Sequence, residues 1–283
     1  MKLRWLVGLG LLAVCFFVAQ TTPASAASLK ISPLRYDASL KEGEKQKGFV
    51  DISNPTAKPA KIRLFVQGFR QTDNSGALTF YDNEAIRAGV QLDFSEVDLA
   101  SHENLHLAFI LDGAKLPSGD TFAVIFASTV PDVAGASAQS VRVGALLVIN
   151  NGTPSPHVAV IQDLSGDMFQ LGDGLSVSFN VHNTAALDKN TGFSPVITVS
   201  AWPYADDTVT GPLVFAGLTR GIDYVKKGNY LGLLAIKVKT GSSEQTIYRL
   251  AITGNWRFLL PILVFLVAFA IWLAGRVHKR FFG

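Results

Sequence analysis

The sequence is almost free of cysteine. Cys15 is the single cysteine in 283 residues, and it lies in the apolar stretch near the N-terminus. The body of the chain therefore has no disulfide, no thiol nucleophile and no cysteine ligand for zinc. Val14 precedes Cys15 where a lipoprotein signal would have a small residue, which argues against lipidation. An exported domain in this chain must therefore be stable without disulfides.

The sequence also lacks runs of one charge. Its formal net charge is +3, and part of that charge belongs to the two ends. We find no lysine run or basic face, so nucleic acid is not an expected partner. Between Ala27 and Asn255 the chain has little helical periodicity, which leaves few segments for helices.

Two long apolar segments are present, one near each end. Residues 1–26 begin with Lys2 and Arg4, continue through a short apolar run and finish with the A-x-A pattern "ASA", as a secretory signal peptide does. Residues 258–275, "FLLPILVFLVAFAIWLAG", carry no charge and are followed by the basic tail "RVHKRFFG". We expect a transmembrane helix at residues 256–275 and a cytoplasmic tail at 276–283. An uncleaved N-terminal anchor and a buried C-terminal helix are the alternatives.

Between these ends the sequence predicts β-strands. Apolar alternation and β-branched runs recur between clusters of Gly, Pro, Asn and Asp. The seven strands expected in the first half are "LKISPLRYDASL", "KGFVDISN", "AKIRLFVQGF", "GVQLDFSEV", "NLHLAFILD", "DTFAVIFAST" and "QSVRVGALLVIN". Their number and spacing are typical of an immunoglobulin-like β-sandwich.

The exported part divides into two regions. The turn-rich "NNGTPSP" begins at residue 150, and a second series of strands begins after it, including "GLSVSFNVHN", "SPVITVSAW" and "YLGLLAIKVKT". We predict an all-β chain with two tandem immunoglobulin-like sandwiches, at residues 27–150 and 157–254, joined by a linker at 151–156. Everything that binds a ligand then lies outside the membrane.

The stretch "HENLH" matches the H-E-x-x-H pattern of zinc proteases. That chemistry needs His102 and His106 on adjacent turns of one helix, so that both imidazoles reach one ion. Here Leu105, Leu107, Phe109 and Leu111 alternate with the residues between them, which predicts a strand. Histidines four residues apart on a strand are about 13 Å apart. We therefore expect no zinc, no cofactor and no enzyme activity, with a metalloprotease as the third interpretation.

The first region resembles two known families. "ISPLRYDASLKEGEKQKGFVDISNPTAKPAKIRLFV", "LPSGDTFAVIFASTVP" and "VRVGALLVINNG" resemble the first domain of WxL-interacting proteins and, more distantly, periplasmic pilus chaperones. The first resemblance implies a peptidoglycan-associated domain, a second sandwich, one C-terminal transmembrane helix and a short basic tail. The second implies that an arginine of the first strand and a basic residue of the last strand hold a carboxylate. Arg35 and Arg142 occupy comparable places.

These patterns favour a membrane-anchored surface protein that acts by binding. The ligand is expected to be cell-wall peptidoglycan or another surface protein, with Arg35 and Arg142 as contacts. The alternative is a chaperone-like assembly factor that works by β-strand complementation. In that case the edge of "SVRVGALLVI" is the segment expected to pair with the partner.

Overall fold

The computed structural model describes residues 28–130, 140–152, 157–186, 191–258, 261 and 264–272. Most of these residues lie in β-strands, which confirms the all-β class, and the strands pair into sandwiches of the immunoglobulin-like kind. Two groups of sheets follow each other along the chain, and no described ladder joins a strand before residue 152 to a strand after it.

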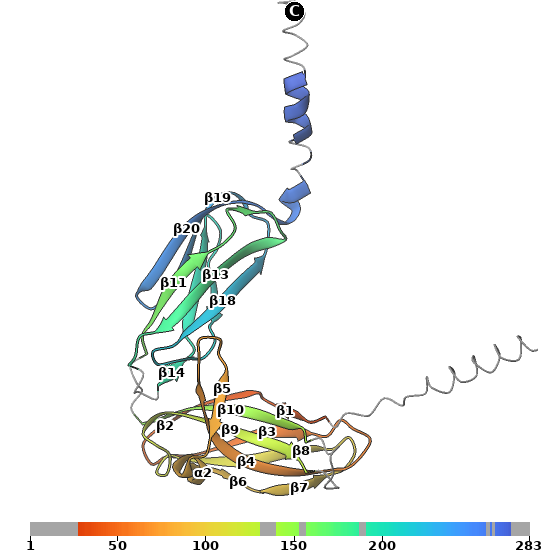
Figure 1. Cartoon of the computed structure of the whole chain (residues 1–283), viewed down its shortest axis with the longest axis vertical. Helices are drawn as coiled ribbons and strands as arrows, with labels where there is room; N and C mark the ends of the chain where they lie inside the picture. The colour runs from red at the N-terminus through yellow and green to blue at the C-terminus, as the bar shows by residue number, and fades with distance from the viewer. Residues whose placement is uncertain are drawn as a thin grey trace, which may run out of the picture.

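The first sandwich consists of two sheets (Figure 1). One has the order β1 (Lys30–Ser32), β3 (Lys45–Ser53), β8 (Asn104–Asp112) and β6 (Val90–Leu92). The other, called here the β10 sheet, has the order β2 (Arg35–Leu40), β10 (Arg142–Asn151), β9 (Gly119–Thr129), β4 (Ala60–Gln71) and β5 (Leu78–Tyr81), with β7 (Glu96–Leu99) also paired to β4. β2 runs parallel to β10, and the other ladders are antiparallel.

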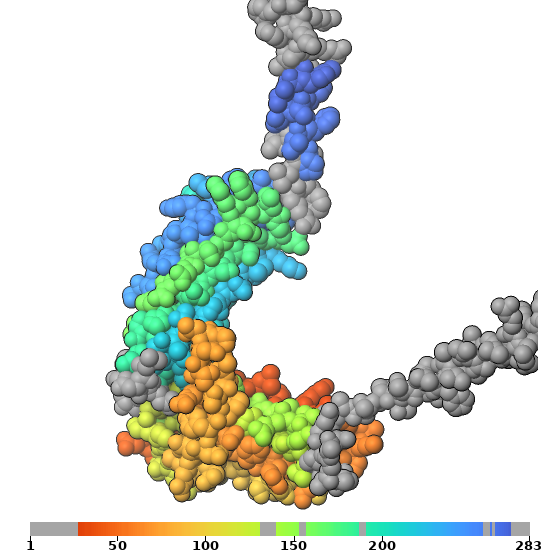
Figure 2. All heavy atoms as spheres, viewed as in Figure 1, coloured from red at the N-terminus to blue at the C-terminus, as the bar shows by residue number. Residues whose placement is uncertain are grey.

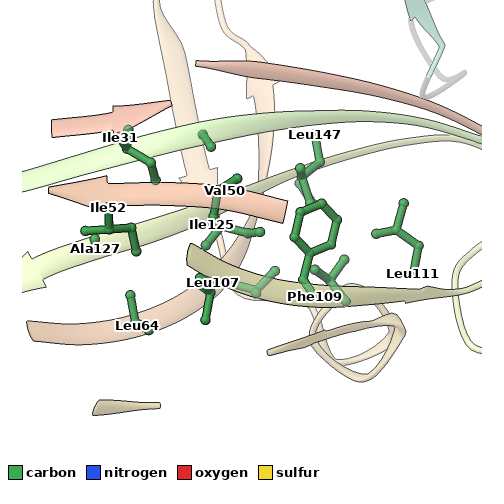
Figure 3. Packing of buried hydrophobic residues seen from close by; sticks show 14 of the residues in the cluster. Ile31, Val50, Ile52, Leu64, Leu107, Phe109, Leu111, Ile125, Ala127 and Leu147 are labelled. Carbon is green, nitrogen blue, oxygen red and sulfur yellow. The ribbon is translucent and has the colours of Figure 1, made fainter. Parts of the chain in front are cut away.

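The core of the first sandwich lies between these two sheets. Period-two alternation brings one side chain in two to the inside of each strand. Figure 3 shows Val50, Ile52, Leu107 and Phe109 on one side of this core and Ile125 and Leu147 on the other. Phe109 and Leu107 are fully buried, so the alternation that predicted a strand after "HEN" also identified its inward face.

Two expected strands are divided in the structure. Pro33 separates β1 from β2, and the two pieces belong to opposite sheets, because proline has no N–H to continue a ladder. The prediction of one continuous strand at "GVQLDFSEV" is also wrong, because this segment contributes to β6 and β7, which belong to opposite sheets. A short helix, α2 (Glu84–Gly89), precedes β6, and the side chain of Asn83 caps it by accepting a hydrogen bond from the N–H of Ile86 (3.0 Å).

The second sandwich also has two main sheets. One has the order β11 (Ala159–Ser165), β13 (Gly174–Asn183) and β18 (Thr219–Lys227). The other, called here the β20 sheet, has the order β12 (Phe169–Gln170), β20 (Ser243–Ile252), β19 (Leu231–Thr240), β15 (Val196–Trp202) and β16 (Asp207–Thr210). β14 (Gly192–Phe193) and β17 (Val214–Phe215) form a small separate pair. The core of the second sandwich contains residues from both main sheets, among them Val181 and Ile236.

The two sandwiches meet at an angle and leave a hollow on one side (Figure 2). The hairpin of β4 and β5 rises from the first sandwich to the second beside this hollow (Figure 1). Of the linker predicted at residues 151–156, Asn151 is the last residue of β10, and residues 153–156 lie outside the described part.

The two predicted end segments are described only in part. The predicted signal peptide and the tail at 276–283 lie outside the described residues. After β20 a 3-10 helix, η1 (Gly254–Phe258), leads to residues 261 and 264–272, which are helical. Among the described residues, no helix combines the length and apolar character that a membrane crossing requires.

Candidate functional site

The two histidines of "HENLH" do not share a helix. His102 lies in a turn with φ of 59°, and its N–H donates to the carbonyl of Thr56 (3.2 Å). His106 lies in β8, where its Nδ1 pairs with Asp51 Oδ1 (2.6 Å) and its ring stacks on Phe49. The predicted strand is confirmed. Within the described residues, no three His, Cys, Asp or Glu side chains are grouped so that they could hold a metal ion.

One half of β10 lies at an open edge. Its second half, Leu146 to Asn151, pairs with β2, and the N–H of Leu146 donates to the carbonyl of Leu34 (2.9 Å). Residues 142–145 pair with β9 on one side and with no described strand on the other. Because backbone groups alternate in direction along a strand, the N–H and C=O of Arg142 and Gly144 point the same way as those of Leu146, toward this open side.

An apolar face adjoins the open edge. It is the outward face of the β10 sheet, called here the aromatic face, and it is formed by Phe65, Phe69, Phe80, Phe122, Val124, Phe126, Leu146 and Val148. Phe126 packs against Phe65 and Phe80, with ring centroids 5.3 and 4.9 Å apart. Phe80 is still 40% exposed, so this end of the face is only partly covered. β10 faces the hollow in Figure 2.

Gly144 keeps the aromatic face flat where it meets the edge. A Cβ at this position would lie 2.8 Å from Val124 Cγ2 and 2.9 Å from Phe126 Cε1, closer than side chains tolerate. The absence of a side chain therefore lets Val124 and Phe126 pack up to the backbone of β10. The same absence leaves the backbone groups of Gly144 open to an approaching chain.

Arg142 is the cation of this site. Its guanidinium carbon lies 5.2 Å from the ring centres of both Phe65 and Phe126. Two such contacts hold an arginine side chain over aromatic rings without neutralising it. No carboxylate among the described residues forms an ion pair with it. Arg142 can therefore donate to an acidic or carbonyl group of a ligand.

Arg35 is engaged differently. It forms an ion pair with Asp37, two residues on along β2 (Nη2 to Oδ1, 2.6 Å), and its Nη1 donates to Ser194 Oγ in the second sandwich (2.7 Å). It lines a pocket of about 660 Å³ between the sandwiches. Asp120, Asn150, His157 and Phe193 also line this pocket. The charge of Arg35 is thus balanced by a neighbour, and its side chain connects the two sandwiches.

The two arginines lie on one face but are far apart along it. Arg35 is opposite Leu146, and Leu146 is four residues beyond Arg142 on β10. Four residues of strand correspond to about 13 Å. A single carboxylate is too small to bridge them, so the two residues can contact only different parts of one ligand.

Contacts between the sandwiches hold the aromatic face in a defined position. Phe215 of β17 packs on Phe122 and Phe69, with ring centroids 4.4 and 6.0 Å apart. Asn74, at the tip of the β4–β5 hairpin, accepts a hydrogen bond from the N–H of Thr219 (2.9 Å). His157 of the second sandwich pairs with Asp120 of the first (Nε2 to Oδ2, 3.0 Å), and the ring of His157 stacks on Phe193. The second sandwich therefore covers one end of the aromatic face and leaves the other end free.

Sequence reasoning missed the aromatic face. One signal was present: "FAVIFA" in β9 is apolar at every position, which is typical of a strand covered on both sides rather than one with a solvated face. The Arg35–Asp37 pair could also have been expected, because residues two apart on a strand share a face.

Comparisons with known proteins place the chain near no characterised family by sequence. No family model matches it, and no curated protein matches it. The resemblance to WxL-interacting proteins is therefore not confirmed.

Solved structures with similar folds include pilus chaperones. One is from the chaperone–tip adhesin complex of CFA/I fimbriae (14% identity, covering 80% of this chain and 100% of that one, TM-score 0.39). Another is from the CsuC–CsuE pre-assembly complex of Acinetobacter baumannii Csu pili (11% identity, 80% and 100% covered, TM-score 0.38). A third is from the complex of Salmonella enterica SafA pilin with the SafB chaperone (13%, 79% and 96%, TM-score 0.38). These similarities are low, and the function proposed below rests on the contacts of this chain.

Proposed function

We propose that this chain is a binding protein without enzyme activity, which accepts an extended segment of another exported protein as an added strand along residues 142–145. This is the chaperone-like alternative of the sequence interpretation. The observation that carries it is the open side of β10, where the backbone groups of Arg142 and Gly144 have no described strand partner.

Strand addition suits this edge for two physical reasons. Main-chain hydrogen bonds to an exposed edge supply affinity, while pockets for alternate side chains supply specificity. Here the exposed part of the aromatic face, at Phe80 beside the buried Phe126, can take up an apolar side chain of the added strand. Arg142 favours a segment with an acidic residue or a terminal carboxylate at the same level.

Arg35 has a different role in this proposal from that of Arg142. Because Asp37 and Ser194 already occupy its guanidinium, a ligand carboxylate must compete with an internal partner. We therefore assign the stronger ligand contact to Arg142, and to Arg35 the positioning of the second sandwich with a weaker contact at the far end of the ligand.

The proposed setting is outside the membrane, as the sequence of the two ends suggests. Residues 27–254 would be exported, and the C-terminal segment would anchor them with the tail at 276–283 in the cytoplasm. Nothing in the described structure favours peptidoglycan over a protein segment as the ligand. A glycan has no backbone N–H and C=O groups to continue the β10 ladder, whereas an extended peptide does.

The test uses two substitutions at one position. Binding of the full chain to overlapping peptides from the exported proteins encoded beside it is measured by titration calorimetry or fluorescence. Arg142→Ala should weaken the tightest complex by about 1.5–3 kcal/mol, because it removes a charged donor. Arg142→Pro should weaken it further, by about 0.5–1.5 kcal/mol, because it also removes the N–H that faces the open edge.

A matched control is available on β20. The N–H of Leu250 donates to Met168 O, so the N–H of Thr246 points in the same direction, away from β19. Thr246→Pro should leave peptide binding unchanged. Equal affinities for Arg142→Pro and Arg142→Ala would refute strand addition at this edge. Retention of the chain by purified peptidoglycan, without peptide binding, would favour the wall-glycan interpretation instead.

A further inference from the structure

The outward face of the β20 sheet carries an uncovered apolar surface at one end. Strand register places Phe169, Leu250 and Leu233 in one cross-strand row. The next row contains Trp202, Ala235 and Tyr248, and a third row pairs Leu231 with Ile252. Neighbours in such rows are about 5 Å apart, so the rows form one continuous surface, called here the apolar end.

The side chains of the apolar end are unusually exposed. Trp202 is 71% exposed, Leu233 is 65% and Tyr248 is 64%. Phe169 and Leu231 are also about half exposed, at 54% and 46%. Single exposed apolar residues are ordinary, but a contiguous set of this size marks a surface that meets another apolar partner.

The same face changes character abruptly along the strands. Beyond the Trp202 row, the next row contains Ser200, Lys237 and Thr246, and the one after it contains Thr198, Lys239 and Glu244. Lys237 and Glu244 form an ion pair there (3.5 Å). The face is therefore apolar at one end and charged at the other. An interface with another protein does not need this change of character along the strands.

The apolar end is also the end at which the chain leaves the sandwich. Ile252 closes β20, η1 follows at Gly254–Phe258, and Trp256 in η1 is 39% exposed. Figure 1 shows the chain leaving at this end toward the C-terminal helical segment. Residues 258–275 contain no charged side chain over eighteen positions, which is long enough to enter a bilayer.

We propose that the apolar end rests on the surface of the lipid bilayer that holds the C-terminal segment. Trp202, Tyr248 and Trp256 then lie at the depth of the headgroups, where amphipathic aromatic rings are favoured. The leucines and Phe169 reach the boundary of the acyl chains, as the apolar face of an interfacial element does. The charged rows at Lys237 and Lys239 stay in water. This contact rests on the membrane anchor proposed above and goes beyond the proposed strand addition, because it orients the second sandwich on the membrane.

Lipid is favoured over protein as the occupant because the apolar end lies next to the uncharged C-terminal run of the same chain. The apolar rows lie at the end of β20, and only residues 253–257, with Arg257 as their single charge, separate β20 from the uncharged run at 258–275. A second copy of the chain could cover the same residues. A surface for a second copy, however, would not need to lie at the end where the chain leaves the sandwich. The test separates these two occupants.

The experiment uses the full chain in phosphatidylcholine vesicles with a single tryptophan. Trp5→Phe, Trp256→Phe and Trp272→Phe leave Trp202 as the only reporter, and vesicles with brominated acyl chains quench tryptophans near the bilayer. The reference variant adds Trp202→Phe and Phe94→Trp, because Phe94 is 50% exposed on the first sandwich. We expect Trp202 to show blue-shifted emission and strong quenching, and the single tryptophan of the reference variant to show neither.

A second substitution tests whether the patch itself makes the contact. Leu233→Asp places a charge at the centre of the apolar end, and it should reduce the quenching of Trp202 while the protein stays in the vesicles. Water-like emission of Trp202 without quenching would overturn the proposal. Blue-shifted emission that brominated lipid does not quench, and that disappears when the protein is diluted in excess lipid, would identify a second copy as the occupant and would also overturn it.

Discussion

The aromatic face of the β10 sheet and the apolar end of the β20 sheet are both apolar surfaces on the outward side of a sheet, but they differ in what covers them. Each is an outward sheet face beside the last strand of its sandwich, and each last strand runs parallel to a short strand from earlier in the chain, β2 or β12. The aromatic face is partly covered by Phe215 and adjoins an open strand edge. The apolar end is uncovered.

The edges beside these faces differ as well. On β20, Ser243 Oγ and Gln245 Oε1 accept hydrogen bonds from the N–H groups of Ile161 and Leu164 on β11 (2.9 and 3.0 Å). No described hydrogen bond connects residues 142–145 of β10 with β1 in this way. An apolar face beside an edge without such side-chain contacts suits an extended chain, whereas one whose edge is tied to the facing sheet suits a surface such as lipid.

The largest expected effect concerns the cover of the aromatic face. Phe215→Ala should lower the free energy of unfolding by about 3–5 kcal/mol, because it empties a buried aromatic contact. Phe80→Ala at the uncovered end of the same face should cost only about 1 kcal/mol, because that ring is already partly in water. Chemical denaturation of both variants measures the difference. Equal losses of stability in the two variants would contradict the view that Phe215 covers one end of the aromatic face and leaves the Phe80 end open.

A smaller effect is expected from filling the glycine position at the open edge. Gly144→Ala should destabilise the protein by about 1–3 kcal/mol, because the new Cβ lies too close to Val124 and Phe126. Gly221→Ala in β18 is the matched control, since its Cβ would meet only Asn180 Oδ1 at 3.4 Å. Thermal unfolding of the two variants tests the comparison. A neutral Gly144→Ala would show that the aromatic face rearranges easily at its edge.

The smallest expected effect is a pH dependence confined to the second sandwich. The Tyr224 hydroxyl donates to Asp207 Oδ2 (2.6 Å), and this hydrogen bond lowers the pKa of Asp207 below its usual value. The stabilisation is present above the unfolded pKa of about 4 and is lost as the pH falls through the lower folded pKa. The stability difference between the native protein and Tyr224→Phe should therefore shrink on acidification. A difference that stays constant from neutral pH to about pH 2 would contradict this assignment.

Local pattern accounts for much of the fold. β8 and β13 coincide with the segments expected from alternation, because β13 has one buried and one largely solvated face and β8 buries Leu107, Phe109 and Leu111 on one face. Segments that change sheets were misassigned: Pro33 divides β1 from β2, and the region around Leu92 divides in the same way. β5 and β18 were missed, since the burial of short or charged strands such as "TRGIDYVKK" depends on neighbours far away in the sequence.

For the candidate site, the edge segment and both arginines could be identified from the sequence, but their surroundings could not. Arg35 and Arg142 are indistinguishable as exposed, strand-borne cations. Only pairing separates them: Asp37 and Ser194 engage the first, and Phe65 and Phe126 hold the second. Ser194 is 159 residues from Arg35, a separation at which no local pattern reports contact.

Residue types and a period of two between neighbours are sufficient to predict the all-β class and the strand character of "NLHLAFILD", and composition is sufficient to exclude cysteine chemistry in the body of the chain. The tertiary structure alone decided which half of β10 is left without a partner, which end of the aromatic face Phe215 covers, and where the exposed rows of the β20 sheet end. These features depend on strand register and on contacts between residues far apart in the chain. Alternation places a side chain on a face, but it does not state what that face meets.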